Sequence, residues 1–280
     1  MKTAILMTMM TALCMLVGKA VGGSGGMLYA LIFGVGMNIY YYWYSDSMVL
    51  SHYNAQEVSR TSVPNLYAMI ERLAKKAGLP MPKVYMIKTD VPNAFATGRN
   101  PEHAVVAVNT GLIKMLSPEE LEGVLAHEIS HIKHRDILTS TIAACMASVI
   151  SYLGQIAQWA MIFGGGRRDE DRGGAMGGLF AIIVAPLAAT LIQMAISRSR
   201  EYEADKSAGE LTGRPMALAD ALLKIESYAK HRVMPNANEA TAHMFIINPL
   251  SGVDFSSLFS THPKTADRVA RLQEQARLMR

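Results

Sequence analysis

Hydrophobic and polar residues fall into blocks along this 280-residue chain. Four predominantly apolar stretches contain no Lys, Arg, Asp or Glu, at residues 3–17, 27–43, 137–163 and 176–196. A helix of about 20 apolar residues is long enough to cross the hydrocarbon core of a bilayer. Extended by their flanks, the stretches therefore predict four transmembrane helices, at about residues 3–20, 27–44, 137–163 and 176–196.

These helices pair into two hairpins that divide the chain. A glycine-rich turn at residues 22–26 joins the first pair. The predicted organisation is a membrane hairpin at 1–44, a polar segment at 45–136, a second hairpin at 137–196 and a polar segment at 197–280. A cleaved signal peptide is the alternative for the first stretch, because Lys2 precedes it and the small residues Gly18 and Ala20 follow it.

Within the polar segments, periodicity predicts an α+β domain. Residues 64–77 carry apolar positions at helical spacing, and short alternating strands are expected at 84–88, 94–97 and 104–108. Ser117, Pro118 and Glu120 then form a capping-box pattern that opens another helix. Further helices are expected at 216–230 and after residues 261–263. The predicted fold is a predominantly α membrane protein with a small sheet.

Composition and charge agree with this picture. Half of the residues are hydrophobic, only 18% are charged and the mean hydropathy is +0.17, which is unusual for a soluble protein. Of the 27 Lys and Arg residues, ten lie in residues 45–138 and twelve in 197–280. An even number of spans places both segments on one side, and the positive-inside rule makes that side the cytoplasm. Three arginines in the loop at 167–172 count against this orientation.

Other classes of function receive little support. The net charge of +4 comes without a dense basic tract, so no nucleic-acid partner is expected, and basic residues near the spans face lipid headgroups instead. The aromatic cluster at residues 40–44 is typical of an interfacial anchor, since no basic residues interleave to make a base-stacking platform. The two cysteines, Cys14 and Cys145, lie in predicted spans and indicate no disulfide framework.

The candidate chemistry lies in His127-Glu128-Ile129-Ser130-His131. Histidines four residues apart project from one face of a helix, where both imidazoles reach a single metal ion. Glu128 beside them is placed to take a proton from a water molecule at the metal, as a zinc hydrolase requires. Only six residues separate His131 from residue 137, or roughly 9 Å along a helix, so the metal is expected close to the membrane surface.

A catalytic zinc site usually has a third protein ligand. The second hairpin returns the chain near residue 197, and there Glu201 and Asp205 lie four residues apart on one helix face. We expect Glu201 to be the third ligand and Asp205 to fix a ligating histidine through its other ring nitrogen. Glu203 and His134 are the alternative ligands.

Three further features bear on substrate. Asn93, Ala94, Phe95 and Ala96 read as an edge strand with which a peptide substrate pairs through its backbone, or as an ordinary half-buried strand. His262 and Arg268 are candidates for support of the transition state. By pattern alone each is equally a helix cap or a salt-bridge partner.

With these residues in view, the chain resembles the HtpX-type membrane zinc metallopeptidases, which are relatives of the CAAX prenyl proteases. The resemblance covers nearly the whole chain. It rests on the motif at 127–131, Glu201 with Asp205, residues 93–96, residues 243–249, residues 261–263 with Arg268, and the two hairpins. It is strongly specific, and no ligand position departs from the pattern.

The resemblance implies a bacterial inner-membrane endopeptidase with a zincin-like domain of the gluzincin type, its active site facing the cytoplasm and holding one zinc ion per chain. It also implies unfolded or damaged membrane proteins as substrates, and it places His262 and Arg268 near the cleft. A prenyl-CAAX protease is the alternative enzyme. A scaffold with structural zinc is the alternative of another class, and it would need a fourth protein ligand.

Overall fold

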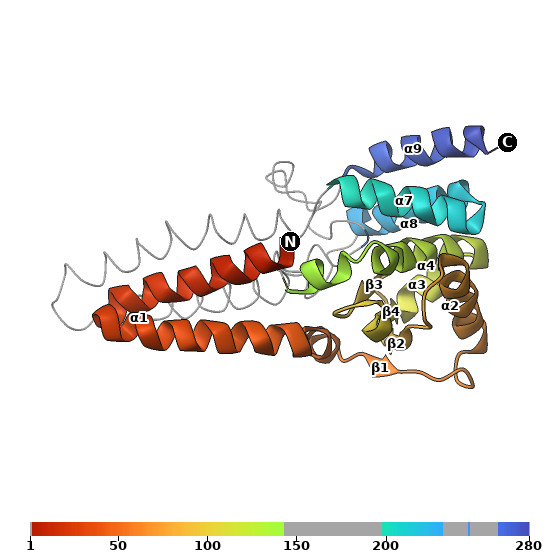
Figure 1. Ribbon diagram of the computed structural model, residues 1–280. Helices are drawn as coiled ribbons and strands as arrows, with labels where there is room; N and C mark the ends of the chain where they lie inside the picture. The colour runs from red at the N-terminus through yellow and green to blue at the C-terminus, as the bar shows by residue number, and fades with distance from the viewer. Residues whose placement is uncertain (1, 143–197, 232–245, 247–262, 280) are drawn as a thin grey trace.

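A computed structural model describes residues 2–142, 198–231, 246 and 263–279 of the chain (Figure 1). The predicted fourth span, all of the third beyond residue 142, and His262 lie outside the described residues. The described part is a helical protein with a small mixed sheet, as the sequence predicts.

The N-terminal helix α1 (Lys2–His52) folds back on itself as two antiparallel arms (Figure 1). Gly23 has a left-handed φ of 61°, and a Cβ added to Gly26 would lie 2.2 Å from the carbonyl oxygen of Gly18, so only glycine allows the arms to approach this closely. Farther along, Asn38 Nδ2 donates to the Met7 carbonyl and to Thr11 Oγ1, both at 2.8 Å. These contacts hold the two arms together as a hairpin.

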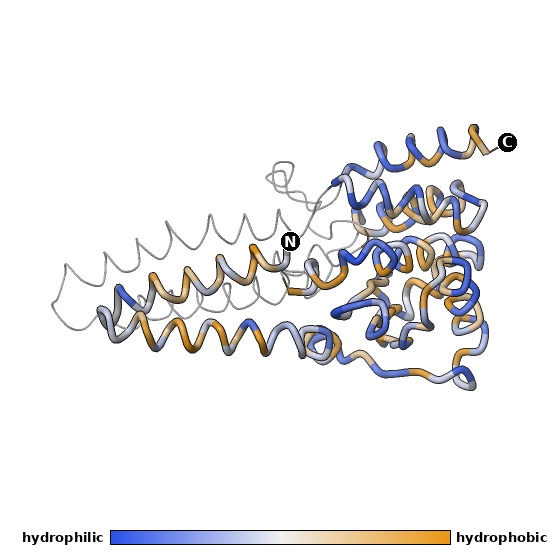
Figure 2. Tube along the Cα trace, in the orientation of Figure 1, coloured by the Kyte–Doolittle hydropathy of each residue, from blue (hydrophilic) through white to orange (hydrophobic). Residues whose placement is uncertain are grey.

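Both arms of this hairpin consist largely of hydrophobic residues, as the colouring of Figure 2 shows. Large hydrophobic side chains are well exposed on it, including Leu28, Tyr29, Ile32 and Phe33, whose relative exposure is 58–77%. None of the helices in the described residues has the combination of length and apolarity that crossing a membrane requires. The four predicted spans stay a prediction.

The sheet has four strands in the order β1-β2-β4-β3: β1 (Gln56–Glu57), β2 (Lys83–Ile87), β3 (Ala94–Thr97) and β4 (Val105–Asn109). Strand β4 runs parallel to β2 and antiparallel to β3, and β1 pairs antiparallel with β2. The three predicted strands are confirmed to within one residue at each end, whereas the two-residue β1 was not predicted. Strand β3 lies at one edge of this sheet, which is one of the two positions that the sequence left open for it.

Alternate residues of the strands pack into two separate hydrophobic cores, one on each face of the sheet. Val106 and Val108 of β4 pack with the helices α2 (Pro64–Ala77) and α4 (Pro118–Lys133). Val105 and Ala107, which point to the opposite face, pack instead with Tyr41, Val49 and Leu50 near the end of α1. The sheet is therefore sandwiched between α4 and the base of the N-terminal hairpin, and this explains why all five β4 residues are buried.

Helix α4 is the central element of the domain (Figure 1). Its predicted capping box is confirmed, since Ser117 Oγ accepts from the Glu120 N–H at 3.3 Å and Glu120 Oε2 accepts from the Ser117 N–H at 2.8 Å. Beyond this cap, every residue from 123 to 130 is buried. Burial on all sides makes α4 a rigid base for the histidines that it carries.

The remaining helices are α3 (Thr110–Met115), α7 (Arg198–Thr212), α8 (Pro215–His231) and α9 (Thr265–Leu278), with a 3₁₀ turn η1 (Pro101–His103). Helices α7 and α8 pack along α4, and α9 packs on both of them. This stacking brings the first turn of α7 to the middle of α4 although about 70 residues separate them in sequence.

Residues 137–142 form a short helical segment after α4. Thr139 Oγ1 lies 2.9 Å from Thr3 Oγ1 at the start of α1, and Thr141 Oγ1 lies 2.9 Å from Thr97 Oγ1 at the end of β3. The segment thus joins the N-terminal hairpin, the sheet edge and the central helix at one place.

The packing of α4 on α8 predicts a steric effect at Gly123. A Cβ there would lie 2.9 Å from the backbone nitrogen of Leu218, so Gly123→Ala should lower the free energy of unfolding by about 1–3 kcal/mol. Gly36→Ala is the matched control, because a Cβ at this helical glycine meets nothing within 4 Å and alanine favours helix by about 1 kcal/mol. Denaturant titration of both variants checks this, and equal stability would contradict the packing.

Candidate metal centre

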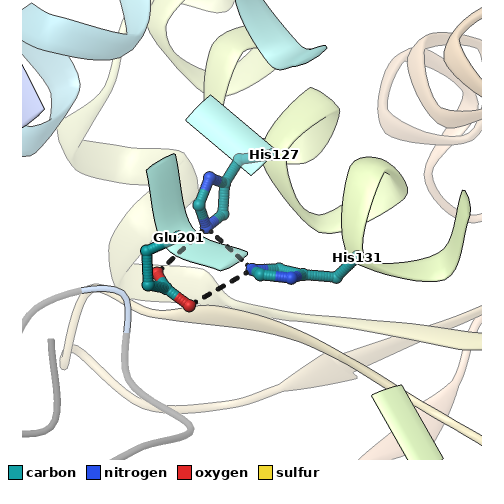
Figure 3. Close-up of side chains that lie close together, drawn as sticks. All are labelled: His127, His131 and Glu201. Atoms are coloured by element: carbon teal, nitrogen blue, oxygen red, sulfur yellow. Dashed lines mark hydrogen bonds and ion pairs between the residues drawn. The ribbon is translucent and has the colours of Figure 1, made fainter. Parts of the chain in front are cut away.

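His127, His131 and Glu201 converge on one point, from one face of α4 and the first turn of α7 (Figure 3). The two histidine Nε2 atoms are 3.0 Å apart. Glu201 completes a triangle, with Oε2 at 3.6 Å from His127 Nε2 and Oε1 at 3.6 Å from His131 Nε2. Within the described residues, no other set of His, Cys, Asp and Glu side chains forms such a group.

The dimensions of this triangle fit a tetrahedral metal ion. Zinc binds histidine nitrogen and carboxylate oxygen at about 2.0–2.1 Å, which places neighbouring ligand atoms of a tetrahedron about 3.3 Å apart. The separations of 3.0 and 3.6 Å bracket this value. The described residues supply three protein ligands, and a site with three protein ligands has an open fourth position, as in catalytic rather than structural zinc sites.

The other ring nitrogen of each histidine faces a carboxylate. His127 Nδ1 is 2.9 Å from Asp205 Oδ1, and His131 Nδ1 is 3.1 Å from Asp136 Oδ2. Because each Nδ1 donates its proton to a carboxylate, each Nε2 is left with a lone pair. Two lone pairs facing each other at 3.0 Å repel unless a proton or a metal ion lies between them.

The raised pKa values of the two histidines also indicate that the group favours a positive charge. Burial alone would lower the pKa of His127, but its hydrogen bonds to Asp205 and Glu201 raise it to about 10. The pKa of His131 is also raised: burial would lower it, and Asp136 outweighs that effect. Without metal the ring of His127 holds a proton at neutral pH, so a bound metal ion would take the place of that proton.

Glu128 lies beside the group and is almost fully buried, with 5% exposure. Its Oε2 accepts a hydrogen bond of 2.8 Å from the backbone N–H of Ala96 in β3. Burial raises the pKa of Glu128, which makes its carboxylate a stronger base than one in water. The carboxylate is therefore both held in position and prepared to accept a proton.

The predicted substrate strand lies against this glutamate. The N–H of Ala96 points away from β4 and towards Glu128. The side chain of Phe95 points to the opposite face of the sheet, where its ring lies 5.6 Å from the ring of Tyr53. Asn93 is buried, and its Oδ1 accepts from the N–H of Ile246 at 3.1 Å. Of the four predicted residues, Ala94 and Ala96 have backbone groups directed to the free edge of the sheet.

Arg268, predicted to support the transition state, is buried behind the metal group with 1% exposure. It binds Asp205 through two short bonds, Nε to Oδ2 at 2.7 Å and Nη2 to Oδ1 at 2.6 Å, and its Nη1 donates to the Ile246 carbonyl at 3.0 Å. Burial would raise the pKa of Asp205, but the charge of Arg268 lowers it to about 2. Asp205 thus stays ionised between Arg268 and His127.

The alternative ligands lie elsewhere. Glu203 is exposed on the outer side of α7, and His134 Nε2 lies 3.3 Å from Ser207 Oγ. The sequence reasoning missed Asp136, because it treated α4 and the following stretch as one nearly continuous helix. An aspartate between a basic run and an apolar stretch was the available signal for a break and a helix cap there.

Comparisons with known proteins agree with this geometry. The profile of the family described as peptidase family M48 matches residues 61–276. A protein from Pyrococcus furiosus named "Protease HtpX homolog" is 53% identical over 275 residues, covering 98% of this chain and 95% of its own. A protein of the same name from Paraburkholderia phytofirmans is 54% identical over 278 residues, covering 99% and 96%.

Among solved structures, the crystal structure of S. mikatae Ste24p is similar, with a TM-score of 0.54 and 21% identity. The match covers 95% of this chain but 65% of Ste24p, so the chain spans less than two thirds of the length of that protein. At this identity the likeness shows a shared fold.

The position of Arg268 predicts that it acts through Asp205. Arg268→Met removes the arginine that balances the charge of the buried Asp205 carboxylate, so it should lower the free energy of unfolding by about 3–5 kcal/mol and weaken metal binding at least about tenfold. Arg268→Lys, which keeps the charge, should recover part of both. Arg271→Met is the control, because Arg271 only covers the ring of Tyr202 at 3.9 Å. Chelator competition measures the affinity, and unchanged binding in Arg268→Met and Arg268→Lys would contradict this role.

Proposed function

Because this chain belongs to peptidase family M48, we propose that it is a membrane-embedded zinc endopeptidase that hydrolyses misfolded or damaged membrane proteins at the cytoplasmic face. That it is a metalloprotease follows from the family and from its group of His127, His131 and Glu201. The observation that carries the proposal is Glu128, which lies beside this group and is hydrogen-bonded to the edge strand.

The protein's own residues supply the base and the scaffold for hydrolysis. His127, His131 and Glu201 would hold one zinc ion per chain, with Asp205 orienting the ring of His127. Zinc bound there would supply a Lewis acid that makes water nucleophilic near neutral pH and polarises the scissile carbonyl. Glu128 accepts the proton of the attacking water and passes it to the leaving amine, and its raised pKa suits both transfers.

Substrate is proposed to bind as an extended strand along β3. The N–H of Ala96 is already used by Glu128, so Ala94 and the carbonyl of Ala96 remain to pair with a substrate backbone. Backbone pairing selects an unfolded, extended chain rather than a particular sequence. This property suits an enzyme that removes misfolded proteins.

The proposed membrane arrangement has four spans, at about 3–20, 27–44, 137–163 and 176–196. Exposed apolar side chains along the α1 hairpin support it, because soluble proteins rarely expose apolar patches of this size. The polar segments at 45–136 and 197–280 would form the cytoplasmic domain. His262 is proposed to stabilise the oxyanion, and Arg268, given its bonds to Asp205, to act by positioning.

The role of Glu128 as the base predicts a separation of binding from catalysis. Glu128→Gln should keep zinc but lower the cleavage rate of an unfolded membrane protein roughly 100- to 10,000-fold, because the amide accepts no proton. Glu119→Gln, an exposed change on the same helix, should cleave at the wild-type rate. Metal analysis and a cleavage assay decide this, and a prenylated peptide cleaved in preference would favour the CAAX-protease alternative. Full turnover in Glu128→Gln would exclude this role.

The ligand assignment makes a second prediction on α7. Glu201→Ala should remove most of the bound zinc, since it deletes one of three ligand atoms, whereas Glu203→Ala, two residues along on the exposed side, should keep it. Metal content of the two purified variants is the measurement. Retention of zinc by Glu201→Ala with loss from Glu203→Ala would reverse the assignment.

A further inference from the structure

Asp136 lies at the joint between α4 and the helical segment at residues 137–142. The chain turns there through Arg135, a non-glycine residue with a left-handed φ of 58°. After this turn, the Asp136 N–H donates to the carbonyl of His131 at 3.3 Å. The turn therefore folds Asp136 back over the last turn of α4, next to a metal-ligating histidine.

The carboxylate of Asp136 is directed at the ring of His131. Its Oδ1 and Oδ2 lie 3.2 and 3.1 Å from His131 Nδ1, so the ring N–H is shared between both oxygens. The Asp136 side chain is only 8% exposed, and a charge-assisted hydrogen bond is strong where water is excluded. On the opposite side of the same ring, Nε2 faces His127 and Glu201.

A simpler explanation for an aspartate at this position is a helix cap. The Asp136 carbonyl does accept the Ser140 N–H at 3.1 Å, which starts the following helical segment. In a cap, however, the side chain accepts from the N–H groups of its own helix. Here both carboxylate oxygens are hydrogen-bonded to His131, so capping does not explain the side-chain orientation.

The surroundings of Asp136 differ from those of Asp205. Asp205 is bound by two short bonds from Arg268, which draws its charge away from His127. The charge of Asp136 also acts on Arg200: burial lowers the pKa of Arg200, and the charges of Asp136 and Glu201 oppose that effect. Both oxygens of Asp136 lie within 3.2 Å of His131 Nδ1.

We propose that Asp136 is a positioning residue of the metal centre, which accepts the Nδ1 proton of His131 and thereby directs Nε2 towards the metal ion. The inference rests on the proposed metal site. It adds Asp136 to the side chains that the site requires, and it explains the left-handed turn at Arg135 by the need to return a carboxylate to the helix that has just ended.

The test compares Asp136→Asn and Asp136→Ser in the full-length protein, with Asp220→Asn, an exposed aspartate of α8, as the control. Asparagine and serine cap helices about as well as aspartate, so a capping role predicts unchanged metal binding in both. Positioning predicts zinc affinity weaker by about 10- to 100-fold in Asp136→Ser, which is too short to reach the ring, and a smaller loss in Asp136→Asn. Competition with a chelator measures the affinity, and the absorption bands of the cobalt-substituted proteins report ligand geometry.

Zinc affinities within twofold of wild type for both variants, with unchanged cobalt spectra, would overturn the inference. If Asp136→Ser does not fold, the isosteric Asp136→Asn decides alone. If the wild-type protein binds zinc and cleaves its substrate, and the Asp136 variants bind zinc equally well, only the proposed role of Asp136 is refuted. A wild-type protein that binds no metal refutes the proposed function and this inference together.

Discussion

The structure depends on the mutual repulsion of two buried imidazole nitrogens. The Nε2 atoms of His127 and His131 lie 3.0 Å apart, and the carboxylates of Asp205 and Asp136 accept hydrogen bonds from the Nδ1 atoms, which fixes the orientation of the rings. Such an arrangement is stable only with positive charge between the rings. Folding thus brings together donor atoms that could hold a cation, and Glu201 adds a negative charge that favours a dication.

The fold around α4 maintains this strained group. A buried charge is costly unless it is paired, and the neighbouring elements supply the pairing: β3 donates an N–H to Glu128, α7 provides Asp205, and α9 provides Arg268. These elements contact the side chains of the central helix from three directions, so the helix is buried on all sides. The order of layers, with the sheet below α4 and three helices around it, follows from this requirement (Figure 1).

Local patterns in the sequence were sufficient to predict much of the metal group and of the helix that carries its histidines. The capping box at Ser117, the spacing of His127 and His131, and the pairing of Glu201 with Asp205 all depend on residues within one helical turn, so they can be read from a sequence. The role of Asp136 depends on a left-handed turn at Arg135, and no glycine stands there to indicate such a turn. The bonds of Arg268 and Asn93 to Ile246 join residues far apart in the chain, and only tertiary structure brings them together.

These long-range hydrogen bonds meet at Ile246. Its N–H binds Asn93 at the start of the edge strand, and its carbonyl binds Arg268, which holds Asp205 against His127. One residue thus fixes the strand proposed to bind substrate relative to a proposed metal ligand, through buried bonds on both sides. Displacement of either by 1 Å would separate the scissile bond from Glu128, which needs a heavy-atom distance of about 2.6–3.2 Å to transfer a proton. Arg268, which the sequence left open between support of the transition state, a helix cap and a salt-bridge partner, is a salt-bridge partner of Asp205 that holds the strand and the metal site in register.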